Sequence, residues 1–128
     1  MPKACRPIRA LVVDDIHDAA ESLARLLQAM DCAATFVTDS NKALDAAEAM
    51  DAEIVFLDIG MPNFDGYQLA RMLRRRHGEA LVLVAVTAYG TPKDRVRSRE
   101  AGFDAHVQKP ADIHIVESIL ATVLSARR

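Results

Sequence analysis

The chain has 128 residues, of which 51% are apolar and 27% are charged, a composition that suits one folded domain and not a disordered tail. Its 16 basic and 18 acidic residues give a formal net charge of −2, which argues against non-specific nucleic-acid binding. The longest apolar run has seven residues (80–86), fewer than the roughly 18 that a membrane span needs, and the first residues lack the apolar segment of a secretory signal. We therefore expect a cytoplasmic domain with no membrane insertion and no direct contact with nucleic acid.

The cysteines and the absence of linkers indicate how the chain is organised. Cys5 and Cys32 match no metal-ligand spacing, which favours free thiols in a reducing compartment and leaves a disulfide between them open. The chain has no repeat, no low-complexity stretch and no linker rich in Gly, Ser or Pro. We expect residues 1–128 to form a single domain whose folded part runs from about Ile8 to Leu124.

The first half of the chain alternates predicted strands with predicted helices. Residues 10–13 form a short apolar run without alternation, which is typical of a strand covered on both faces. From Asp18 to Met30 the apolar residues step by 3, 4 and 3, as on one face of a helix. A weaker strand at 33–37 and an alanine-rich helix at 41–50 follow.

The second half repeats this alternation with three further pairs of elements. In chain order the predicted elements are a strand at 54–57, a helix at 65–76, a strand at 81–86, a charged helix at 92–101, a weaker strand at 105–108 and a helix from 113 to 123. Strand followed by helix, five times over, predicts a parallel sheet with helices on both faces.

Polar residues stop these apolar runs, and they are the candidate functional residues. Asp14 and Asp15 follow the first strand, Asp58 the third and Thr87 the fourth, whereas Lys109 follows the last short strand. The carboxyl ends of parallel strands lie along one edge of a sheet, where sites of open α/β sheets form. We therefore expect these side chains to converge in one cleft.

The charges in that cleft predict a divalent cation. Asp14, Asp15 and Asp58 would repel one another, and Lys109 would offset only one of the three negative charges. Oxygen ligands without His or Cys favour Mg²⁺ over zinc. A carboxylate beside Mg²⁺, with a lysine and the Thr87 hydroxyl nearby, is suited to accept a phosphoryl group, and Asp58 would be the nucleophile.

Four motifs at these strand ends resemble the receiver domain of two-component response regulators. They are VVDD at 12–15, FLDIGMPNFDG at 56–66, VTA at 86–88 and QKP at 108–110. The resemblance covers nearly the whole chain, in order and with the spacing of that family. It implies a flavodoxin-like (βα)5 three-layer sandwich with a parallel sheet in the order 2-1-3-4-5.

The resemblance also implies a role for each candidate residue. Asp58 matches the phosphoacceptor, Asp14 and Asp15 match the acidic pair that holds Mg²⁺ with Asp58, and the backbone carbonyl of Gly60 completes the metal site. Mn²⁺ is expected to substitute for Mg²⁺. Thr87 and Lys109 match the hydroxyl and lysine of the family, and the Lys109–Pro110 bond is expected to be cis.

A signalling role without further enzymatic activity follows from the resemblance. The phosphodonor would be a sensor histidine kinase or a histidine phosphotransfer domain, and the chain would catalyse only its own phosphotransfer and dephosphorylation. Phosphorylation would change the face formed by the helix at 92–101, the strand at 105–108 and the helix from 113, where receivers also form dimers.

Several positions depart from the common receiver pattern, among them His106, and two others border the site. His106 occupies the place of the usual switch aromatic, so it is either a half-buried edge histidine, the interpretation we favour, or a pH-sensitive switch that moves toward Thr87. Gly60 and Tyr89 border the expected path of the hydrolytic water, and their opposite effects leave the lifetime of the acyl phosphate open.

Two clusters outside the motifs have simpler interpretations. Arg71, Arg74, Arg75 and Arg76 are interpreted as a solvated, cationic helix end. The neighbours His17 and Asp18 mimic a metal pair, but we interpret them as exposed residues at the start of a helix.

Rival functions and the context of the domain also have to be weighed. A phosphatase of the haloacid-dehalogenase type needs a second acid two residues after its nucleophile, where this chain has Gly60. A phosphorylation-independent module usually lacks one or more of the site residues, all of which are present here.

The context of the domain is left open by the sequence. The domain would be a stand-alone receiver, a phosphorelay intermediate or the receiver of a hybrid histidine kinase. Only the hybrid kinase would tether it to a membrane. The initial Met1 favours a stand-alone receiver. In contrast, three segments resemble the receivers of hybrid kinases, namely residues 18–24, 57–62 and 101–106.

Overall fold

The computed structural model describes residues 6–60, 65–88 and 92–126. They form one sheet of five parallel strands in the order β2-β1-β3-β4-β5, which confirms the predicted fold class and strand order. The strands are β1 (Arg9–Val13), β2 (Ala33–Val37), β3 (Ile54–Asp58), β4 (Val82–Thr87) and β5 (Ala105–Gln108).

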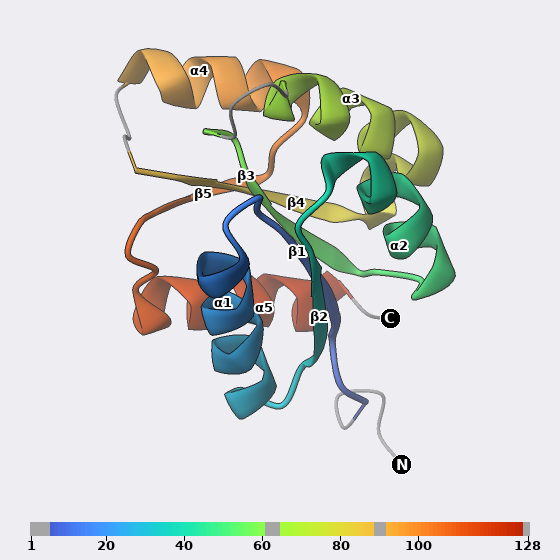
Figure 1. Ribbon diagram of the computed structural model, residues 1–128, viewed down its shortest axis with the longest axis vertical. Coiled ribbons are helices and arrows are strands. Elements are labelled where there is room, and N and C mark those ends of the chain that lie inside the picture. Colours follow the sequence, from blue (N-terminus) through green and yellow to red (C-terminus); the bar gives the residue numbers. More distant parts are fainter. Residues whose placement is uncertain (1–5, 61–64, 89–91, 127–128) are drawn as a thin grey trace.

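Helices cover both faces of the sheet (Figure 1). They are α1 (His17–Ala29), α2 (Ala43–Ala49), α3 (Gly66–His77), α4 (Pro92–Ala101) and α5 (Ile113–Ala126), with short 3-10 turns η2 (Ser40–Lys42) and η3 (Gly78–Ala80). In the view of Figure 1, α1 and α5 lie below the sheet, and α3 and α4 lie above it.

The strands have no alternation because both of their faces are buried. All five residues of β3 are buried, and its neighbour β1 is buried from Ala10 to Val13. One core, which includes Phe56, packs against α1 and α5, whereas a second, which includes Leu57, packs against α2, α3 and α4. The uninterrupted apolar runs therefore predicted the two-sided packing correctly.

Side-chain caps fix where two of the helices begin. The Asp65 carboxylate accepts hydrogen bonds from the backbone N–H groups of Tyr67 (2.9 Å) and Gln68 (3.3 Å), so α3 starts after Asp65. Asp112 accepts from the backbone N–H of His114 (2.8 Å) in the first turn of α5. These caps use backbone donors that have no partner within the helix.

Most element boundaries differ from the sequence prediction by one residue or more, and two of these differences have a clear local cause. The predicted helix at 41–50 is divided into η2 and α2, because Asp39 accepts a hydrogen bond from the backbone N–H of Asn41 and begins a tighter turn there. The predicted strand at 81–86 begins one residue later, at Val82, because η3 leads into it, and it includes Thr87.

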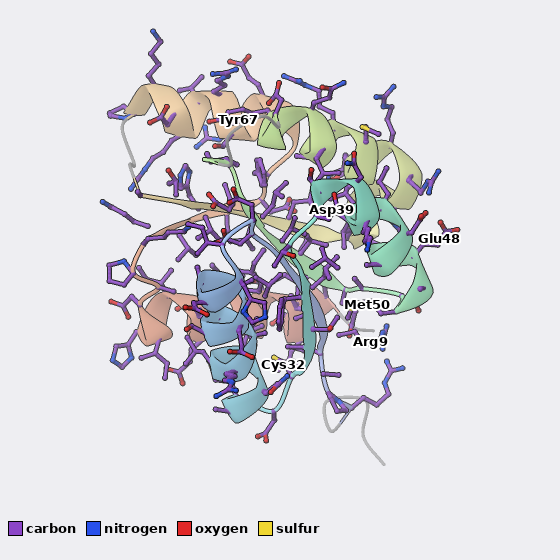
Figure 2. All side chains as sticks on the ribbon, viewed as in Figure 1. Arg9, Cys32, Asp39, Glu48, Met50 and Tyr67 are labelled. Carbon is purple, nitrogen blue, oxygen red and sulfur yellow. The ribbon has the colours of Figure 1, made fainter. Side chains whose placement is uncertain are left out.

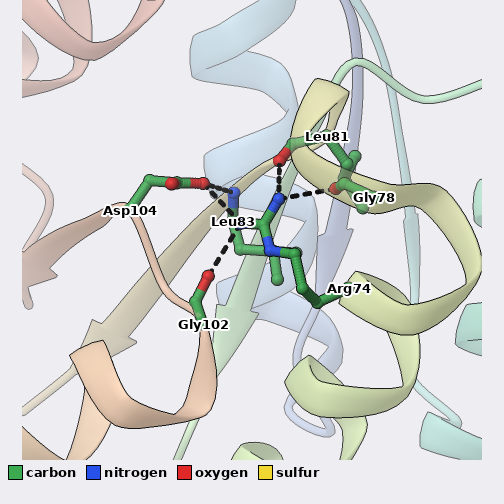
Figure 3. A network of polar contacts seen from close by, with 6 residues as sticks. All are labelled: Arg74, Gly78, Leu81, Leu83, Gly102 and Asp104. Carbon is green, nitrogen blue, oxygen red and sulfur yellow. Dashed lines mark hydrogen bonds and ion pairs between the residues drawn. The ribbon is translucent and has the colours of Figure 1, made fainter.

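The interpretation of the α3 arginines as a solvated helix end is wrong for Arg74. Its side chain is only 15% exposed, and its guanidinium donates to the carbonyls of Gly78, Leu81 and Gly102 and to the Asp104 carboxylate at 2.5 to 2.7 Å (Figure 3). Asp104 also accepts from the backbone N–H of Leu83 at 2.9 Å. Arg74 therefore links the end of α3, the start of β4 and the turn that leads into β5.

The structure bears on two further expectations, the absence of a membrane span and the state of the cysteines. Within the described residues, no helix is both long enough and apolar enough to span a bilayer. Cys32 is buried with a free thiol, near the end of α1 (Figure 2), and burial raises the pKa of that thiol. Cys5 lies outside the described residues, so the question of a disulfide stays a prediction.

Candidate functional site

The carboxyl ends of the strands bring the predicted residues to one edge of the sheet. Asp14 follows β1, whereas Asp58 and Thr87 are the last residues of β3 and β4. The backbone N–H of Lys109, directly after β5, donates to the carbonyl of Thr87 at 2.7 Å. This bond extends the sheet pairing by one residue and holds Lys109 beside the end of β4. The Lys109–Pro110 peptide bond is cis, as expected.

Lys109 is the cation of the cleft. Its Nζ lies 3.1 Å from Oδ2 of Asp14 and 3.1 Å from Oδ2 of Asp58, and it donates a hydrogen bond to each. The carboxylate side chains are 6% and 8% exposed, whereas the lysine side chain is 30% exposed. The charge pairs therefore lie in a partly dehydrated pocket, where electrostatic interactions are stronger than at the surface.

The carboxylates form a donor set that fits a hard divalent cation. Asp14, Asp15 and Asp58 each offer one oxygen, and these three oxygens lie within 4.8 Å of one another. Asp14 and Asp58 are buried, and Asp15 is exposed at the mouth. Oxygen ligands alone suit Mg²⁺ or Mn²⁺, and the exposed Asp15 leaves a route from solvent.

Backbone N–H groups hold the two buried carboxylates in place. Oδ1 of Asp58 accepts from Gly60 at 2.8 Å, and Oδ1 of Asp14 accepts from Ile16 at 3.0 Å. Each aspartate therefore has one oxygen held by the backbone and the other directed to Lys109. Neither backbone donor was predicted from the sequence, although an aspartate at the end of a strand commonly accepts from the residue two positions on.

A glycine at the start of α3 permits a close backbone approach beneath Asp58. A Cβ atom on Gly66 would lie 2.9 Å from Cα of Ile59 and 3.4 Å from the carbonyl oxygen of Asp58. Only glycine fits there without moving the loop that carries the acceptor. Gly66 belongs to one of the four motifs, but this contact was not predicted from the sequence.

The electrostatics of the cleft follow from burial and from the lysine. Burial raises the pKa of Asp14, with a smaller contribution from the Asp58 charge, and the hydrogen bonds from Ile16 and Lys109 oppose this rise without cancelling it. For Lys109, burial alone would lower the pKa, but the hydrogen bonds and charges of Asp14 and Asp58 outweigh burial and raise it. Burial of the charged Asp14 carboxylate therefore costs folding free energy in the metal-free protein.

Replacing Asp14 with asparagine is expected to stabilise the metal-free protein by about 1 kcal/mol, or about 3–6 °C in Tm. The folded-state pKa of Asp14 lies above its ordinary value of 3.8, so stability is lost as the pH rises through the folded-state pKa. The loss grows as the pH rises above the ordinary pKa and is absent below it, where the carboxyl is protonated in both states. The asparagine carbonyl can still accept from Ile16.

Thermal unfolding at several pH values, with a chelator present, measures this effect. The Tm difference between D14N and the wild type should be largest at neutral pH and should disappear near pH 3.8. A difference that grows on acidification would contradict the assignment of the strain to the Asp14 carboxylate.

Of two further predicted positions, His106 and Tyr89, the structure describes only His106. His106, in β5, is partly buried, its Nε2 atom has no hydrogen-bond partner, and burial followed by the Arg95 charge lowers its pKa. This agrees with the favoured interpretation of a half-buried edge histidine, and its role as a switch stays a prediction. Tyr89 lies outside the described residues.

The second acidic cluster is a surface feature. His17, Asp18 and Glu21 each bring one ligand atom within 4.8 Å of the others, but His17 and Asp18 are 64% and 98% exposed. The His17 ring instead packs edge-on against Phe36, with the ring centroids 5.3 Å apart. This arrangement agrees with the interpretation of exposed residues at the start of α1.

The comparisons with known proteins agree with this geometry. A family model described as the response regulator receiver domain matches residues 10–121. Response regulator MprA from Mycolicibacterium vanbaalenii is 34% identical over 122 residues, which cover 95% of this chain and 51% of that protein. The chain therefore spans about half the length of this relative. Hybrid signal transduction histidine kinase L from Dictyostelium discoideum is 32% identical over 111 residues, covering 80% of this chain and 6% of that protein.

A solved structure extends the match to three dimensions. The CheY-like response regulator receiver domain from Methylobacillus flagellatus has a TM-score of 0.79 at 30% identity and covers 91% of this chain and 98% of that chain. The strand order, the acidic cleft at the strand ends and the family match over residues 10–121 lead to one conclusion. The chain belongs to the receiver domain family of two-component response regulators.

Proposed function

We propose that this chain accepts a phosphoryl group on Asp58 from a phosphohistidine of a sensor histidine kinase or a histidine phosphotransfer domain. The observation that carries the proposal is the position of Lys109, whose Nζ lies 3.1 Å from both Asp14 and Asp58. A lysine held there neutralises charge on the buried acceptor and is within reach of the oxygens of an incoming phosphoryl group.

The transfer step is a displacement at phosphorus. An oxygen of the Asp58 carboxylate forms a bond to phosphorus as the phosphorus–nitrogen bond of the phosphohistidine breaks, and the neutral imidazole leaves with the bonding electrons. The product is an acyl phosphate. Lys109 stabilises the negative charge on the transferred group, and the buried Thr87 hydroxyl at the end of β4 donates to one of its oxygens afterwards.

Asp14, Asp15 and Asp58 are the residues that would hold Mg²⁺, with Mn²⁺ as a substitute and the Gly60 carbonyl as a further ligand. The ion would supply positive charge for the phosphoryl oxygens, which the single Lys109 cannot fully balance. Asp14 and Asp58 are held by backbone N–H groups, so these two carboxylates would be oriented before such an ion binds.

The proposed output is a change in the face formed by α4, β5 and α5, which would present a phosphorylation-dependent surface to a partner or to a second copy of the chain. In this proposal the chain catalyses only its own phosphorylation and dephosphorylation. The rival function, a phosphorylation-independent module, would keep the fold but accept no phosphoryl group. A phosphatase of the haloacid-dehalogenase type is disfavoured, because this chain has Gly60 where such an enzyme needs a second acid.

Intact-mass measurement after incubation with acetyl phosphate or phosphoramidate tests the proposal. We expect a Mg²⁺-dependent gain of one phosphoryl group in the wild type and in D45N, a matched change of an exposed aspartate on α2, but not in D58N. Failure of the wild type to gain mass, together with failure to bind Mg²⁺, would favour the phosphorylation-independent module. A gain that persists in D58N would assign the acceptor to another residue.

If the wild type binds Mg²⁺ but gains no mass from a small donor, the assay is repeated with a phosphorylated histidine phosphotransfer domain. Transfer from that domain alone would support the proposal and show that the site needs its protein donor. No transfer from either donor would contradict it.

A further inference from the structure

The layer formed by α3 and α4 holds much of the positive charge of the chain. These two helices contain eight of the 16 basic residues but two of the 18 acidic residues, Asp94 and Glu100. They lie on the same side of the sheet (Figure 1), and they pack against each other. The chain is therefore strongly asymmetric in charge, although its formal net charge is −2.

Some of these cations already have partners within the fold. Arg74 belongs to the buried network at the end of α3. Arg76 lies 3.1 Å from a carboxylate oxygen of Glu48. The Arg97 guanidinium stacks 4.4 Å above the ring of Tyr67, which is labelled in Figure 2. The other exposed cations of the two helices are Arg71, Arg75, Lys93, Arg95 and Arg99.

On α3, the side turned away from the sheet carries two arginines. Arg71 and Arg75 are about one helical turn apart, and both lie opposite the buried Leu73, because successive residues turn by about 100° around a helix axis. Both arginines are exposed. Met72, which is 36% exposed, adds an apolar group beside them.

On α4, the corresponding side combines charge with an apolar side chain. Val96 lies opposite the buried Ser98 and is 55% exposed. Lys93 and Arg99 lie on either side of Val96, and Glu100 also lies on this side. The outward sides of the two helices together therefore carry a net positive charge and two exposed apolar side chains.

An extended anionic surface complements these outward sides. Arginine and lysine bind phosphate groups, which nucleic acids and lipid headgroups both offer. Met72 and Val96 favour lipid, because an exposed apolar side chain finds a partner at the boundary between headgroups and acyl chains but none on a phosphodiester backbone. The rest of the chain has an excess of acidic residues, so an anionic surface would attract the molecule in one orientation.

We propose that the outward sides of α3 and α4 bind the surface of a bilayer that contains anionic lipids, with their cations against the lipid phosphates and with Met72 and Val96 between the headgroups. The two helices lie on the bilayer and do not cross it. Each cation held near an anionic bilayer increases partitioning about fivefold. This binding requires no phosphorylation of Asp58.

Co-sedimentation of the unphosphorylated chain with lipid vesicles tests this inference independently of the proposed phosphorylation. The vesicles consist of phosphatidylcholine with about one-third phosphatidylglycerol, and vesicles of phosphatidylcholine alone are the neutral control. At low ionic strength we expect saturable binding to the anionic vesicles, loss of that binding as salt is added, and no binding to the neutral vesicles. A lipid with a paramagnetic headgroup should broaden the backbone NMR signals of α3 and α4 more than those of α1 and α5.

Matched variants show whether binding depends on this surface. R75Q and R25Q each remove one exposed arginine, the first from α3 and the second from α1 on the other side of the sheet (Figure 1). We expect R75Q to weaken partitioning about fivefold and the double variant of R71Q and R75Q about 25-fold, whereas R25Q should leave it unchanged. Because these positions are exposed, the variants should keep the Tm of the wild type.

The inference is overturned if the chain does not bind the anionic vesicles at low ionic strength, or if it binds the neutral vesicles as tightly. It is also overturned if R25Q weakens binding as much as R75Q does, because the net charge of the chain, and not this surface, would then govern binding. Duplex DNA that displaces the vesicles at equal phosphate concentration would assign the surface to nucleic acid and not to lipid.

Discussion

Replacement of Lys109 with glutamine is expected to slow phosphoryl transfer to Asp58 by about 100-fold, because removal of one preorganised donor to a developing oxyanion has effects of about 10²–10³. Lys109 Nζ lies 3.1 Å from Asp14 and 3.1 Å from Asp58, and the raised pKa of Lys109 keeps the amine charged through neutral pH. Glutamine retains a hydrogen-bond donor but removes the charge.

Single-turnover transfer from acetyl phosphate at saturating Mg²⁺ measures this change, with K42Q as the control at an exposed lysine outside the cleft. K42Q should react at the wild-type rate. Because K109Q leaves the carboxylates without their cation, it should also bind Mg²⁺ at least as tightly as the wild type does. A K109Q variant that transfers at the wild-type rate would remove Lys109 from the proposed chemistry.

Replacement of Arg74 with alanine is expected to destabilise the fold by about 3 kcal/mol, or about 10 °C in Tm. The guanidinium donates to three backbone carbonyls and to the Asp104 carboxylate, and its side chain is 15% exposed (Figure 3). Alanine leaves the carbonyls of Gly78, Leu81 and Gly102 without this donor and Asp104 without its cation.

Thermal and urea unfolding measure the loss, and R75A, an exposed change at the next position of α3, is the control. R74K should be intermediate, because lysine keeps the charge but cannot reproduce the planar fork of donors. An R74A variant with the stability of R75A would show that the network adds nothing to the folded state.

Much of the cleft could be predicted because strand ends are visible in the sequence. Asp14, Asp58 and Thr87 each interrupt or follow an apolar run, and parallel pairing brings such positions to one edge of the sheet. The distance between Lys109 and Asp14 could not be predicted, because it depends on the side-chain conformations and on the fold of the chain between two residues 95 positions apart.

The role of Arg74 was missed because the arginines were interpreted as one charged group. Helical spacing could have separated them: Arg74 lies four residues after the buried Ala70 and directly after the buried Leu73, so it borders the buried face of α3. Arg75 and Arg76 lie farther from that face and are exposed. The acceptors of Arg74 are mainly backbone carbonyls, which leave no mark in the sequence.

The burial of Ser98, in α4, could not be predicted for a related reason. The pattern of α4 has few apolar residues, and nothing in it distinguishes the buried Ser98 from a solvated serine. His106 was singled out only because it departs from the receiver pattern. Whether two polar groups lack partners depends on every neighbour around them, which only the folded structure provides.

The bridge from Lys109 to Asp14 and Asp58 also makes the completed site depend on the edge strand β5. It joins residues 95 and 51 positions apart in the chain, and Lys109 follows β5, which lies at an edge of the sheet. A chain in which β1 and β3 have paired but β5 has not docked holds its carboxylates together without the lysine. If Asp58 is the phosphoacceptor, as proposed, phosphorylation therefore requires that the last strand of the sheet is in place.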